Sequence, residues 1–373
     1  MIFKRYIVCA ILLAASVVTS AQKIMLGSCL TKDGGEYNGE MAVGKPHGKG
    51  KTVWKNGNTY EGEYSKGRRE GYGIYTFADG EKYEGQWVQD HQHGQGTYYY
   101  ANNNRYEGLW YRDFQHGKGT MYYYNGDVYT GFWYEDKRQG KGKYTFASGA
   151  YYDGDWKDGK KSGRGVFDWA DGSSYDGQWL NDKKHGEGKY KYANGDYYVG
   201  QFQDDLQHGK GIYRFQNGDR YEGGYVKGKR QGSGVFTYAN GDKYTGQFRD
   251  GEKEGTGTFA WTDGNVYTGQ WKSDLPNGKG RLSTKAGDVV EGQFVNGHPD
   301  GECIGHMSDG SKFKALYKNG RRNGPSIEET KDGKRFEGSY TEGRRDGEFV
   351  EKDRNGKVTA RGTYQNGRRM VQQ

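Results

Sequence analysis

Two segments of the sequence approach the spacing of a phosphate-binding loop. Residues 154–160 and 223–229 each contain a glycine followed, after four residues, by Gly-Lys. Such a loop needs a Ser or Thr hydroxyl directly after the lysine, but Lys161 and Arg230 stand there. Both segments also occupy the same phase of a 23-residue period, which explains their similarity. We therefore expect no nucleotide site in either segment.

Five of the eight histidines recur at multiples of 23 residues: His47, His93, His116, His185 and His208. A metal ion needs ligands about 2 Å away. Residues one hairpin apart on a sheet are separated by two strands, roughly 9.5 Å. We therefore interpret these histidines as a solvated stripe and predict no metal site.

Three arginine pairs stand near the C-terminal end of the sequence. Residues 311–373 contain 16 Lys and Arg against 9 Asp and Glu, a balance of +7, whereas residues 22–310 carry 38 basic and 39 acidic residues. A nucleic-acid-binding protein spreads positive charge along a face, so we expect no nucleic-acid partner. A basic end suits an anionic lipid surface better. The candidate residues for such binding are Arg321, Arg322, Arg344, Arg345, Arg368 and Arg369.

Other chemistry is not indicated. No Ser/His/Asp grouping, carboxylate pair or metal-ligand spacing stands apart from the repeat pattern. We predict a protein that is not an enzyme, with no catalytic residues and no cofactor.

One period of 23 residues governs nearly the whole chain. Eleven tyrosines keep this spacing, and Val290, Phe313 and Phe336 continue it, giving about fourteen units. A glycine follows two residues later in every unit except at Ala315. We number each repeat from this residue, position 0. The tyrosines are Tyr37, Tyr60, Tyr83, Tyr106, Tyr129, Tyr152, Tyr175, Tyr198, Tyr221, Tyr244 and Tyr267.

The spacings inside a repeat predict two β-strands. Large rings at positions 0 and 4 share one face of a strand, because side chains alternate with period two. Glycines at positions 11 and 13 are expected on the same face as rings at positions 15 and 17. Asn-Gly, as at Asn56 and Gly57, predicts a two-residue hairpin turn with both residues at positive φ. The fold class is therefore all-β: an elongated, twisted, single-layer antiparallel β-meander or solenoid of hairpin repeats.

A single layer has no second sheet to cover its rings. We expect the rings of one strand to lie over glycine notches on the next strand. The rings at positions 0 and 4 are then the core, although exposed Tyr and Trp can also stack on sugars or lie at a membrane interface. The repeat-defining structural residues are Tyr83, Gly85, Trp87, Gly94, Gly96, Tyr129, Gly131, Trp133, Gly140 and Gly142.

The N-terminus predicts export. Lys4 and Arg5 precede a 13-residue mostly apolar run, and small residues before Gln22 offer a cleavage site. The alternatives are an uncleaved anchor and a lipid on Cys29, which ends a lipobox-like segment. A disulfide between Cys29 and Cys303 is not expected, because some twelve repeats separate them. Cys303 stands where a notch glycine would be and is interpreted as a small buried thiol.

The repeats resemble MORN (membrane occupation and recognition nexus) repeats. The resemblance rests on Tyr-x-Gly, the aromatic ring at position 4, Gly-x-Gly and the period, as in residues 83–87 and 94–98. It implies a β-hairpin ribbon that holds proteins or membranes together, and it implies no catalytic activity. Repeats after residue 289 depart from the pattern, as terminal repeats that cap a sheet edge are expected to do.

We divide the chain into a signal peptide (1–21), a lead-in (22–36), eleven regular repeats (37–289) and degenerate basic repeats with a C-terminal cap (290–373). The predicted function is a scaffold for protein–protein interaction at the cell envelope or outside the cell. The first alternative is binding to a membrane of anionic phospholipid, and the second is binding to a glycan or cell wall. The expected location is periplasmic, cell-surface or secreted; the partner and the oligomeric state stay open.

Overall fold

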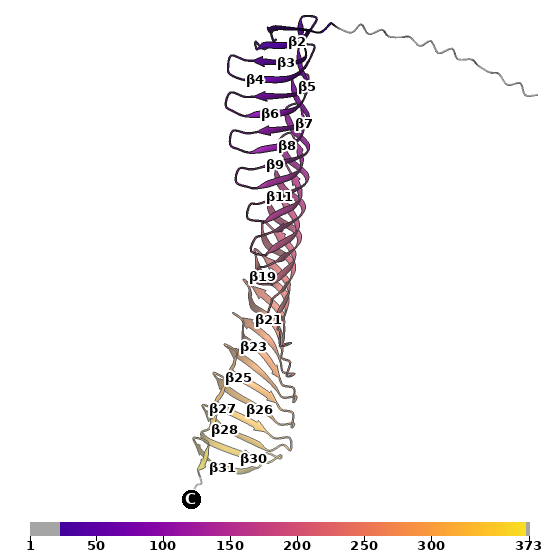
Figure 1. Ribbon diagram of the computed structural model, residues 1–373. Helices are drawn as coiled ribbons and strands as arrows, with labels where there is room; N and C mark the ends of the chain where they lie inside the picture. Colours follow the sequence, from indigo (N-terminus) through magenta and orange to yellow (C-terminus); the bar gives the residue numbers. More distant parts are fainter. Residues whose placement is uncertain (1–22, 371–373) are drawn as a thin grey trace, which may run out of the picture. The chain divides into compact units, whose positions relative to one another are not determined.

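The computed structural model describes residues 23–370, and all regular structure in that range is β-strand. It contains two compact units, one ending at Gly140 and the other beginning at Lys141. Within each unit, hairpin follows hairpin (Figure 1). The predicted all-β class and the antiparallel hairpin repeat of 23 residues are confirmed. The predicted signal peptide lies outside the described residues.

The strands of the first unit are short and regular in length. They are β1 (Met25–Leu30), β2 (Glu36–Ala42), β3 (Lys45–Val53), β4 (Thr59–Ser65), β5 (Arg68–Thr76), β6 (Lys82–Val88), β7 (His91–Tyr99), β8 (Arg105–Tyr111), β9 (Phe114–Tyr122) and β10 (Val128–Tyr134). The division between the units falls in β11 (Lys137–Thr145).

In the second unit, as in the first, strands of 7 residues mostly alternate with strands of 9 residues. Its strands are β12 (Tyr151–Lys157), β13 (Lys160–Asp168), β14 (Ser174–Leu180), β15 (Lys183–Lys191), β16 (Tyr197–Gln203), β17 (Leu206–Arg214), β18 (Arg220–Val226), β19 (Lys229–Thr237), β20 (Lys243–Arg249), β21 (Glu252–Ala260), β22 (Val266–Lys272), β23 (Leu275–Ser283), β24 (Val289–Val295), β25 (His298–His306), β26 (Lys312–Lys318), β27 (Arg321–Glu329), β28 (Arg335–Thr341), β29 (Arg344–Arg345), β30 (Gly347–Lys352), β31 (Val358–Gln365) and β32 (Arg368–Met370).

Each strand pairs antiparallel with the strand before it and the strand after it. In the first unit the pairing is continuous from β1 to β10. In the second unit it is continuous from β12 to β28. β28 then pairs with both β29 and β30, because the strand that follows β28 is divided into these two pieces. Each unit is therefore an open meander.

The tight two-residue turn lies at positions 6 and 7 of the repeat. Between β6 and β7, Gln89 and Asp90 have φ of 50° and 74°. Two consecutive residues at positive φ are typical of a type I′ turn, whose twist matches that of the flanking strands. Gly or Asp therefore recurs at position 7, because both residue types tolerate this backbone conformation.

The prediction of a two-residue turn at Asn-Gly is wrong. At Asn56–Gly57 only the glycine has positive φ, 90°. The Gly57 amide donates to the Trp54 carbonyl at 3.0 Å, and the Trp54 amide donates to the Asn58 carbonyl at 2.9 Å. This is a three-residue loop, a type I turn followed by a left-handed glycine. The Asn56 side chain instead accepts a hydrogen bond from the Asn58 amide at 3.1 Å.

The glycine notch is made by positions 2 and 13, not by position 11. Gly85 and Gly96 face each other across the ladder, and a Cβ on Gly96 would collide with the Tyr83 ring. Gly94, at position 11, has φ of 59° and lies in a β-bulge, and a Cβ there would collide with the Gln86 side chain on the other face. The prediction that positions 11 and 13 share the ring face is wrong, because the extra residue of a bulge breaks the alternation.

The second repeat-defining group shows the same division of roles. Gly131 faces Gly119 across the ladder, whereas Gly140 has φ of 69° and its missing Cβ would lie 3.7 Å from that of Phe132. The Gly142 carbonyl accepts a hydrogen bond from the Trp156 indole at 2.9 Å. The bulge glycines at position 11 therefore face outward, and the glycines at position 13 lie on the ring face.

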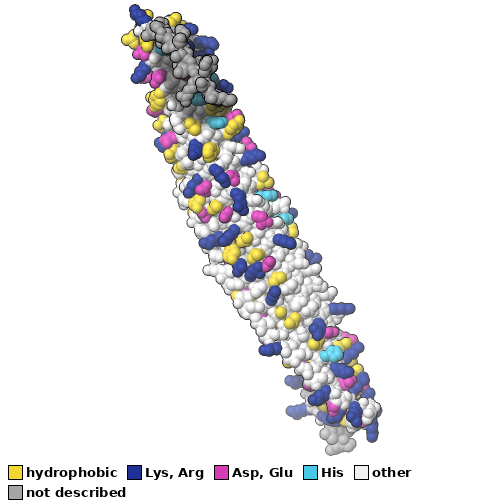
Figure 2. Space-filling model, turned by 90° about the vertical axis from the view of Figure 1, so that its right-hand side faces the viewer, with side chains coloured by type: hydrophobic (Ala, Val, Ile, Leu, Met, Phe, Trp, Pro, Cys, Tyr) yellow, Lys and Arg dark blue, Asp and Glu magenta, His cyan; other side chains and the backbone are white. Residues whose placement is uncertain are grey.

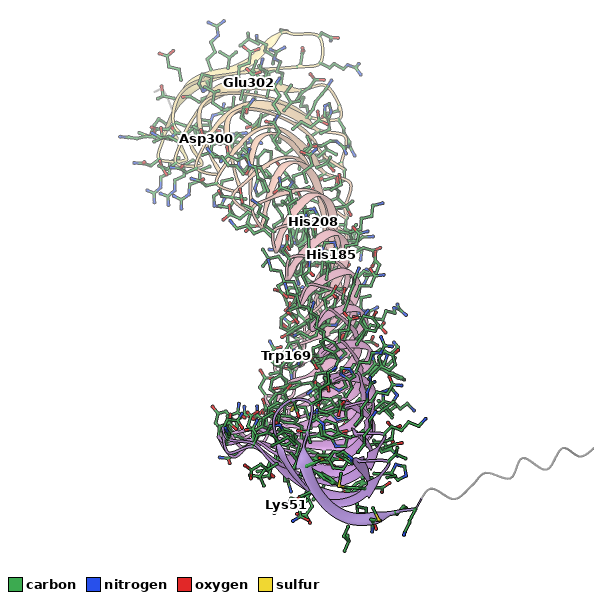
Figure 3. All side chains as sticks on the ribbon, turned by 90° about the horizontal axis from the view of Figure 1, so that it is seen from above. Lys51, Trp169, His185, His208, Asp300 and Glu302 are labelled. Carbon is green, nitrogen blue, oxygen red and sulfur yellow. The ribbon has the colours of Figure 1, made fainter. Side chains whose placement is uncertain are left out.

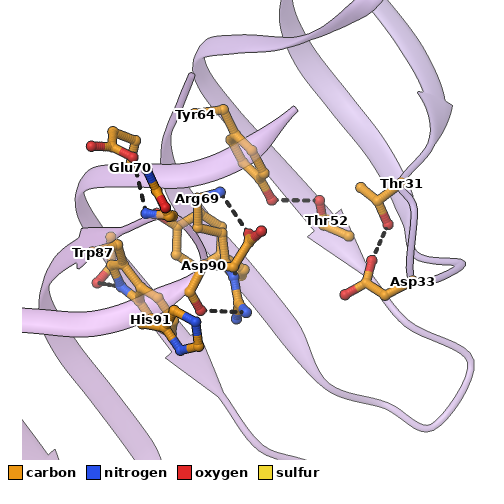
Figure 4. Close-up of polar contacts among 12 residues, drawn as sticks. Thr31, Asp33, Thr52, Tyr64, Arg69, Glu70, Trp87, Asp90 and His91 are labelled. Carbon is orange, nitrogen blue, oxygen red and sulfur yellow. Dashed lines mark hydrogen bonds and ion pairs between the residues drawn. The ribbon is translucent and has the colours of Figure 1, made fainter. Parts of the chain in front are cut away.

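Side-chain oxygens fasten many repeats to the next at the turns. The Asp90 amide donates to the Arg69 carbonyl at 3.1 Å, and the Arg69 amide donates to Oδ1 of Asp90 at 2.8 Å (Figure 4). At the opposite edge, Oδ1 of Asp242 accepts from the Thr262 amide at 2.8 Å. Both edges of the meander are thus tied by bonds between neighbouring repeats.

Both described cysteines are free thiols. Cys303 is fully buried at the notch position opposite Gly292, as predicted, and burial raises the pKa of its thiol. Within residues 23–370 no helix has the length and apolar character needed to cross a membrane. On the surface seen in Figure 2, acidic and basic side chains are interspersed.

Candidate interaction surface

Within each unit, rings at positions 0 and 4 form an edge-to-face column. Tyr175 meets Trp179 of its own repeat at 5.1 Å between ring centroids, and Trp179 meets Tyr152 of the preceding repeat at 5.4 Å. Tyr175 is 0% exposed and Trp179 is 5% exposed. The prediction that these rings form the core is confirmed. Their faces are consequently closed to any ligand.

The polar atoms of these core rings are satisfied by the backbone. The Tyr175 hydroxyl donates to the Gln178 carbonyl at 2.9 Å, and burial raises the pKa of this phenol well above its usual value. The Trp179 indole donates to the Gly165 carbonyl of the preceding repeat at 3.0 Å. The first hydrogen bond fixes the ring within its own repeat, and the second joins that repeat to the preceding one.

A second ring column, at positions 15 and 17, is half-buried except at Phe167, Phe236 and Phe259, which are buried. Phe167 stacks on Trp169 at 4.4 Å with an interplanar angle of 26°, and Trp169 approaches Tyr190 of the next repeat at 5.5 Å. The column is continuous through the second unit up to Trp261. Its members are Tyr144, Phe146, Phe167, Trp169, Tyr190, Tyr192, Tyr213, Phe215, Phe236, Tyr238, Phe259 and Trp261.

Cations at position 9 lie over these rings. Lys184 Nζ is 4.5 Å from the Tyr190 centroid, the Arg230 guanidinium is 5.4 Å from that of Phe236, and Lys253 Nζ is 5.4 Å from that of Phe259. Such contacts stabilise a partly desolvated cation by about 0.5–2 kcal/mol. Burial lowers the pKa of Lys184, and Asp205 offsets part of that effect.

Two cavities open on this side of the second unit. The larger, of about 480 Å³, is lined by Trp261, Phe259, Lys253, Pro276 and Leu282 among others. A smaller one of about 200 Å³ lies on the Arg230 side of Lys253. The larger cavity exists because the next repeat places Pro276 where a long cation would stand, and Leu282 and Thr284 where two rings would stand.

We call this surface the ring–cation face. It comprises Lys184, Tyr190, Tyr192, Tyr213, Phe215, Arg230, Phe236, Tyr238, Lys253, Phe259 and Trp261.

The second arginine of each C-terminal pair contacts both a ring and a carboxylate of the protein. Arg322 pairs with Glu328 at 2.6 Å and lies 4.2 Å over the Phe313 ring, and Arg345 pairs with the same Glu328 at 2.9 Å. Burial opposes the charge of Arg322, but the hydrogen bond to Tyr317 and the Glu328 charge raise its pKa overall. Arg369 lies 4.8 Å over Phe349 and pairs with Glu351 at 3.5 Å.

The first arginine of each pair points outward. Arg321, Arg344 and Arg368 are exposed, and Arg321 pairs with Glu342 at 3.3 Å. Successive turns stack here, since a Cβ on Gly343 would lie 4.0 Å from that of Arg321. The six predicted residues therefore separate into an outer set, the first arginine of each pair, and an inner set, the second arginine of each pair, of which Arg369 is nevertheless exposed.

The histidines of position 10 are half-buried rather than fully solvated. His185 and His208 lie in successive repeats (Figure 3) and help to line a cavity of about 390 Å³. His93 and His116 flank the Tyr111 ring at 5.3 and 5.6 Å. No group of three or more His, Cys, Asp or Glu side chains in residues 23–370 could hold a metal ion.

The phosphate-loop-like segments are hairpin turns. Residues 154–160 leave β12, turn at Asp158 and Gly159 and enter β13, and residues 223–229 do the same between β18 and β19. A strand, not the amino end of a helix, follows each turn. The N–H groups of a helix start, on which phosphate binding in such loops depends, are therefore not supplied.

The ring–cation face was not predicted from the sequence. Its signal was the recurrence of Lys, Arg or Gln at position 9 in most repeats. The break in the pattern at Pro276 and Thr284, where a cation and a ring are replaced, was the signal for the cavity.

Together these features define a β-hairpin repeat protein whose core rings are closed and whose second ring column is partly open. The chain belongs to the MORN-repeat family, because the family model matches twelve tandem repeats. They cover residues 37–59, 60–82, 83–105, 106–128, 129–151, 152–174, 175–197, 198–220, 221–243, 244–266, 267–289 and 291–312.

Solved structures offer only distant similarities. The SAS-4 (dCPAP) TCP domain of Drosophila melanogaster, solved with a proline-rich motif of Ana2, is 16% identical, with 42% of this chain and 85% of that chain covered and a TM-score of 0.27. A mutant TCP10 domain of Danio rerio CPAP is 13% identical, with 72% and 99% covered and a TM-score of 0.20. Virginiamycin B lyase from Staphylococcus aureus is 10% identical, with 78% and 98% covered and a TM-score of 0.14. Scores this low carry no argument about function. A search of curated protein sequences finds no match.

Proposed function

We propose that this chain is a non-enzymatic scaffold that holds a segment of another protein on its ring–cation face. The observation that carries the proposal is the cavity of about 480 Å³ beside the half-buried Trp261. Binding sites for proteins and ligands are concave, mostly apolar and furnished with a few polar groups. Lys253, Asp263 and Asn265 supply those groups around this cavity.

A site-specific photo-crosslinker tests this function. It is placed at Trp261 or Tyr238 on the ring–cation face and, as a control, at Val199, which is 41% exposed on the other face of its strand. We expect the same polypeptide to be crosslinked from both ring-face sites and not from residue 199. Equal crosslinking from all three sites would contradict the proposal.

We further propose that this binding takes place at the cell envelope or outside the cell. The support is the signal-like N-terminus, with cleavage before Gln22. Mass spectrometry of the exported protein is expected to find Gln22 as the first residue. An intact Met1 or a lipid on Cys29 would argue against this processing.

Contact with an anionic membrane is a second candidate function, favoured by the outward set of arginines. Arg321, Arg344 and Arg368 are exposed, and Figure 2 shows several basic side chains projecting near the C-terminal end. Each such charge contributes about 1 kcal/mol near an anionic lipid surface. Changing these three residues to Gln is expected to abolish sedimentation with anionic liposomes while the thermal midpoint stays within a degree or two, since exposed substitutions cost little.

The inner set provides the control. Changing Arg322, Arg345 and Arg369 to Gln removes the same charge but leaves the half-buried Glu328 without two of its partners. Breaking a half-buried pair is expected to cost more than the roughly 0–1 kcal/mol of an exposed pair, so this variant should lose stability, whatever its liposome binding. Liposome binding that is equal in the parent and the outer-set variant would sink the membrane candidate.

A further inference from the structure

The C-terminal repeats reveal what the position-9 cations bind. Arg322 and Arg345 stand at position 9 over the rings of Phe313 and Phe336, at 4.2 and 3.8 Å. Both pair with one carboxylate, Glu328, which occupies position 15, where earlier repeats place a ring. A cation of this column thus takes a carboxylate as its partner when one is within reach.

The same column lacks that carboxylate on the ring–cation face. Lys184 lies over Tyr190, and Lys253 donates to the Tyr238 hydroxyl at 3.1 Å and lies over Trp271. Among the described residues neither lysine side chain forms an ion pair, although the Asp205 charge acts on Lys184 and Asp274 accepts the Lys253 backbone amide at 2.9 Å. Lys253 lines the open cavity, and an ammonium group without an ion-pair partner in such a place is a site for an anionic group from outside the chain.

The spacing of the column fits an extended peptide. Arg230 and Lys253 belong to successive repeats and are two strands apart, ~9.6 Å along the meander. A polyproline II helix has three residues per turn and rises ~3.1 Å per residue, so every third side chain faces the same way at ~9.3 Å intervals. Grooves lined with aromatic rings are the usual docking sites for this conformation.

We propose that the segment held on the ring–cation face is an acidic, extended peptide with a carboxylate at about every third residue. The proposal rests on the scaffold function above and specifies its partner. The carboxylates pair with Lys184, Arg230 and Lys253, and an apolar side chain of the peptide fills the cavity beside Trp261. The carboxylates of the peptide pair with these cations as Glu328 pairs with Arg322 and Arg345 within the chain.

The test measures binding of fluorescent (Glu-Pro-Pro)4 to the full chain by anisotropy, beside (Ser-Pro-Pro)4 and (Lys-Pro-Pro)4. We expect the acidic peptide to bind, the neutral peptide to bind at least about tenfold more weakly and the basic peptide not to bind. The double variant Lys184→Gln/Lys253→Gln should weaken binding of the acidic peptide by about tenfold or more.

Lys183→Gln/Lys229→Gln is the matched control, because it removes two positive charges from exposed lysines that stand directly before Lys184 on β15 and before Arg230 on β19. It should change the affinity less than about twofold, since exposed charges contribute little to affinity. Equal losses in the two double variants would show nonspecific attraction and overturn the proposal.

Protection of the lysines from acetylation in the unaltered chain tests the proposal without a variant that could misfold. The acidic peptide should protect Lys184 and Lys253 from acetylation and leave Lys183 reactive. If (Ser-Pro-Pro)4 binds as tightly as the acidic peptide, or if an acidic oligosaccharide or anionic vesicles alone protect these lysines, the acidic-peptide proposal fails. Crosslinking of a protein at Trp261 would in that case still uphold the scaffold function, so the two failures are distinguishable.

Discussion

The glycine at position 13 supports the ring core because it has no side chain. Gly96 lies directly beneath the Tyr83 ring, and Gly85 faces it across the ladder. The phenol of Tyr83 lies flat over this pair, so its hydroxyl reaches the Gln86 carbonyl at 2.9 Å. A side chain in place of Gly96 would displace the Tyr83 ring from the glycine pair and from the Gln86 carbonyl.

Gly96→Val is therefore expected to lower the free energy of unfolding by about 1–3 kcal/mol, the usual cost of overpacking a core. Gln95→Val is the control, since Gln95 is the next residue on the same strand and its side chain is exposed. Urea unfolding followed by tryptophan fluorescence measures both. Equal losses would contradict the assignment of the notch to position 13.

At the scale of the element, the two turns of a hairpin repeat have different geometries and different anchors. The turn at positions 6 and 7 places Asp90 at φ of 74°, and its carboxylate receives the Arg69 amide at 2.8 Å. The preceding repeat has Gly67 at this position, which keeps the backbone geometry without a carboxylate. The turn therefore depends first on backbone conformation and second on the side-chain bond.

Asp90→Ala and Asp90→Gly separate these two contributions. Both substitutions remove the carboxylate, but only Ala keeps a Cβ in the left-handed region, where a non-glycine residue costs roughly 1–2 kcal/mol. We expect the Ala variant to be less stable than the Gly variant by about 1 kcal/mol. Thermal unfolding measures the difference, and a Gly variant that is less stable than the Ala variant would contradict the type I′ geometry.

At the scale of the whole molecule, the buried phenols make stability sensitive to alkali. Burial raises the pKa of Tyr221, Tyr244 and Tyr267 to about 12 from an ordinary value of 10.0. Between these values the unfolded chain releases phenol protons that the folded chain keeps, so the folded state binds more protons. Stability from this source is complete below about pH 10 and falls as pH rises toward about 12.

Alkaline titration should therefore show one steep step above pH 10, in which tyrosinate absorbance rises as the β-sheet circular dichroism signal is lost. Gradual ionisation of all tyrosines with an unchanged dichroism signal would contradict the buried phenol column.

The candidate site was less accessible to sequence analysis than the fold. The outward face of Arg321 and the inward face of Arg322 follow from strand alternation, but the partner of Arg322 does not. That partner, Glu328, also accepts Arg345 from the next repeat, and only the cross-strand register brings the three together. The cavity beside the Lys253 ammonium is likewise lined by residues of three successive repeats.

The 23-residue period, the hairpin and the ring core were determined by the sequence alone, because side-chain alternation is a local property of a strand. Tertiary structure decided where the alternation breaks. The bulge at Gly94 and the three-residue loop at Gly57 depend on hydrogen bonds between strands, which set backbone conformation at a single residue. The ion pairs of Glu328 and the cavity at Trp261 depend on contacts between repeats, and register, not local pattern, fixes which side chains meet there.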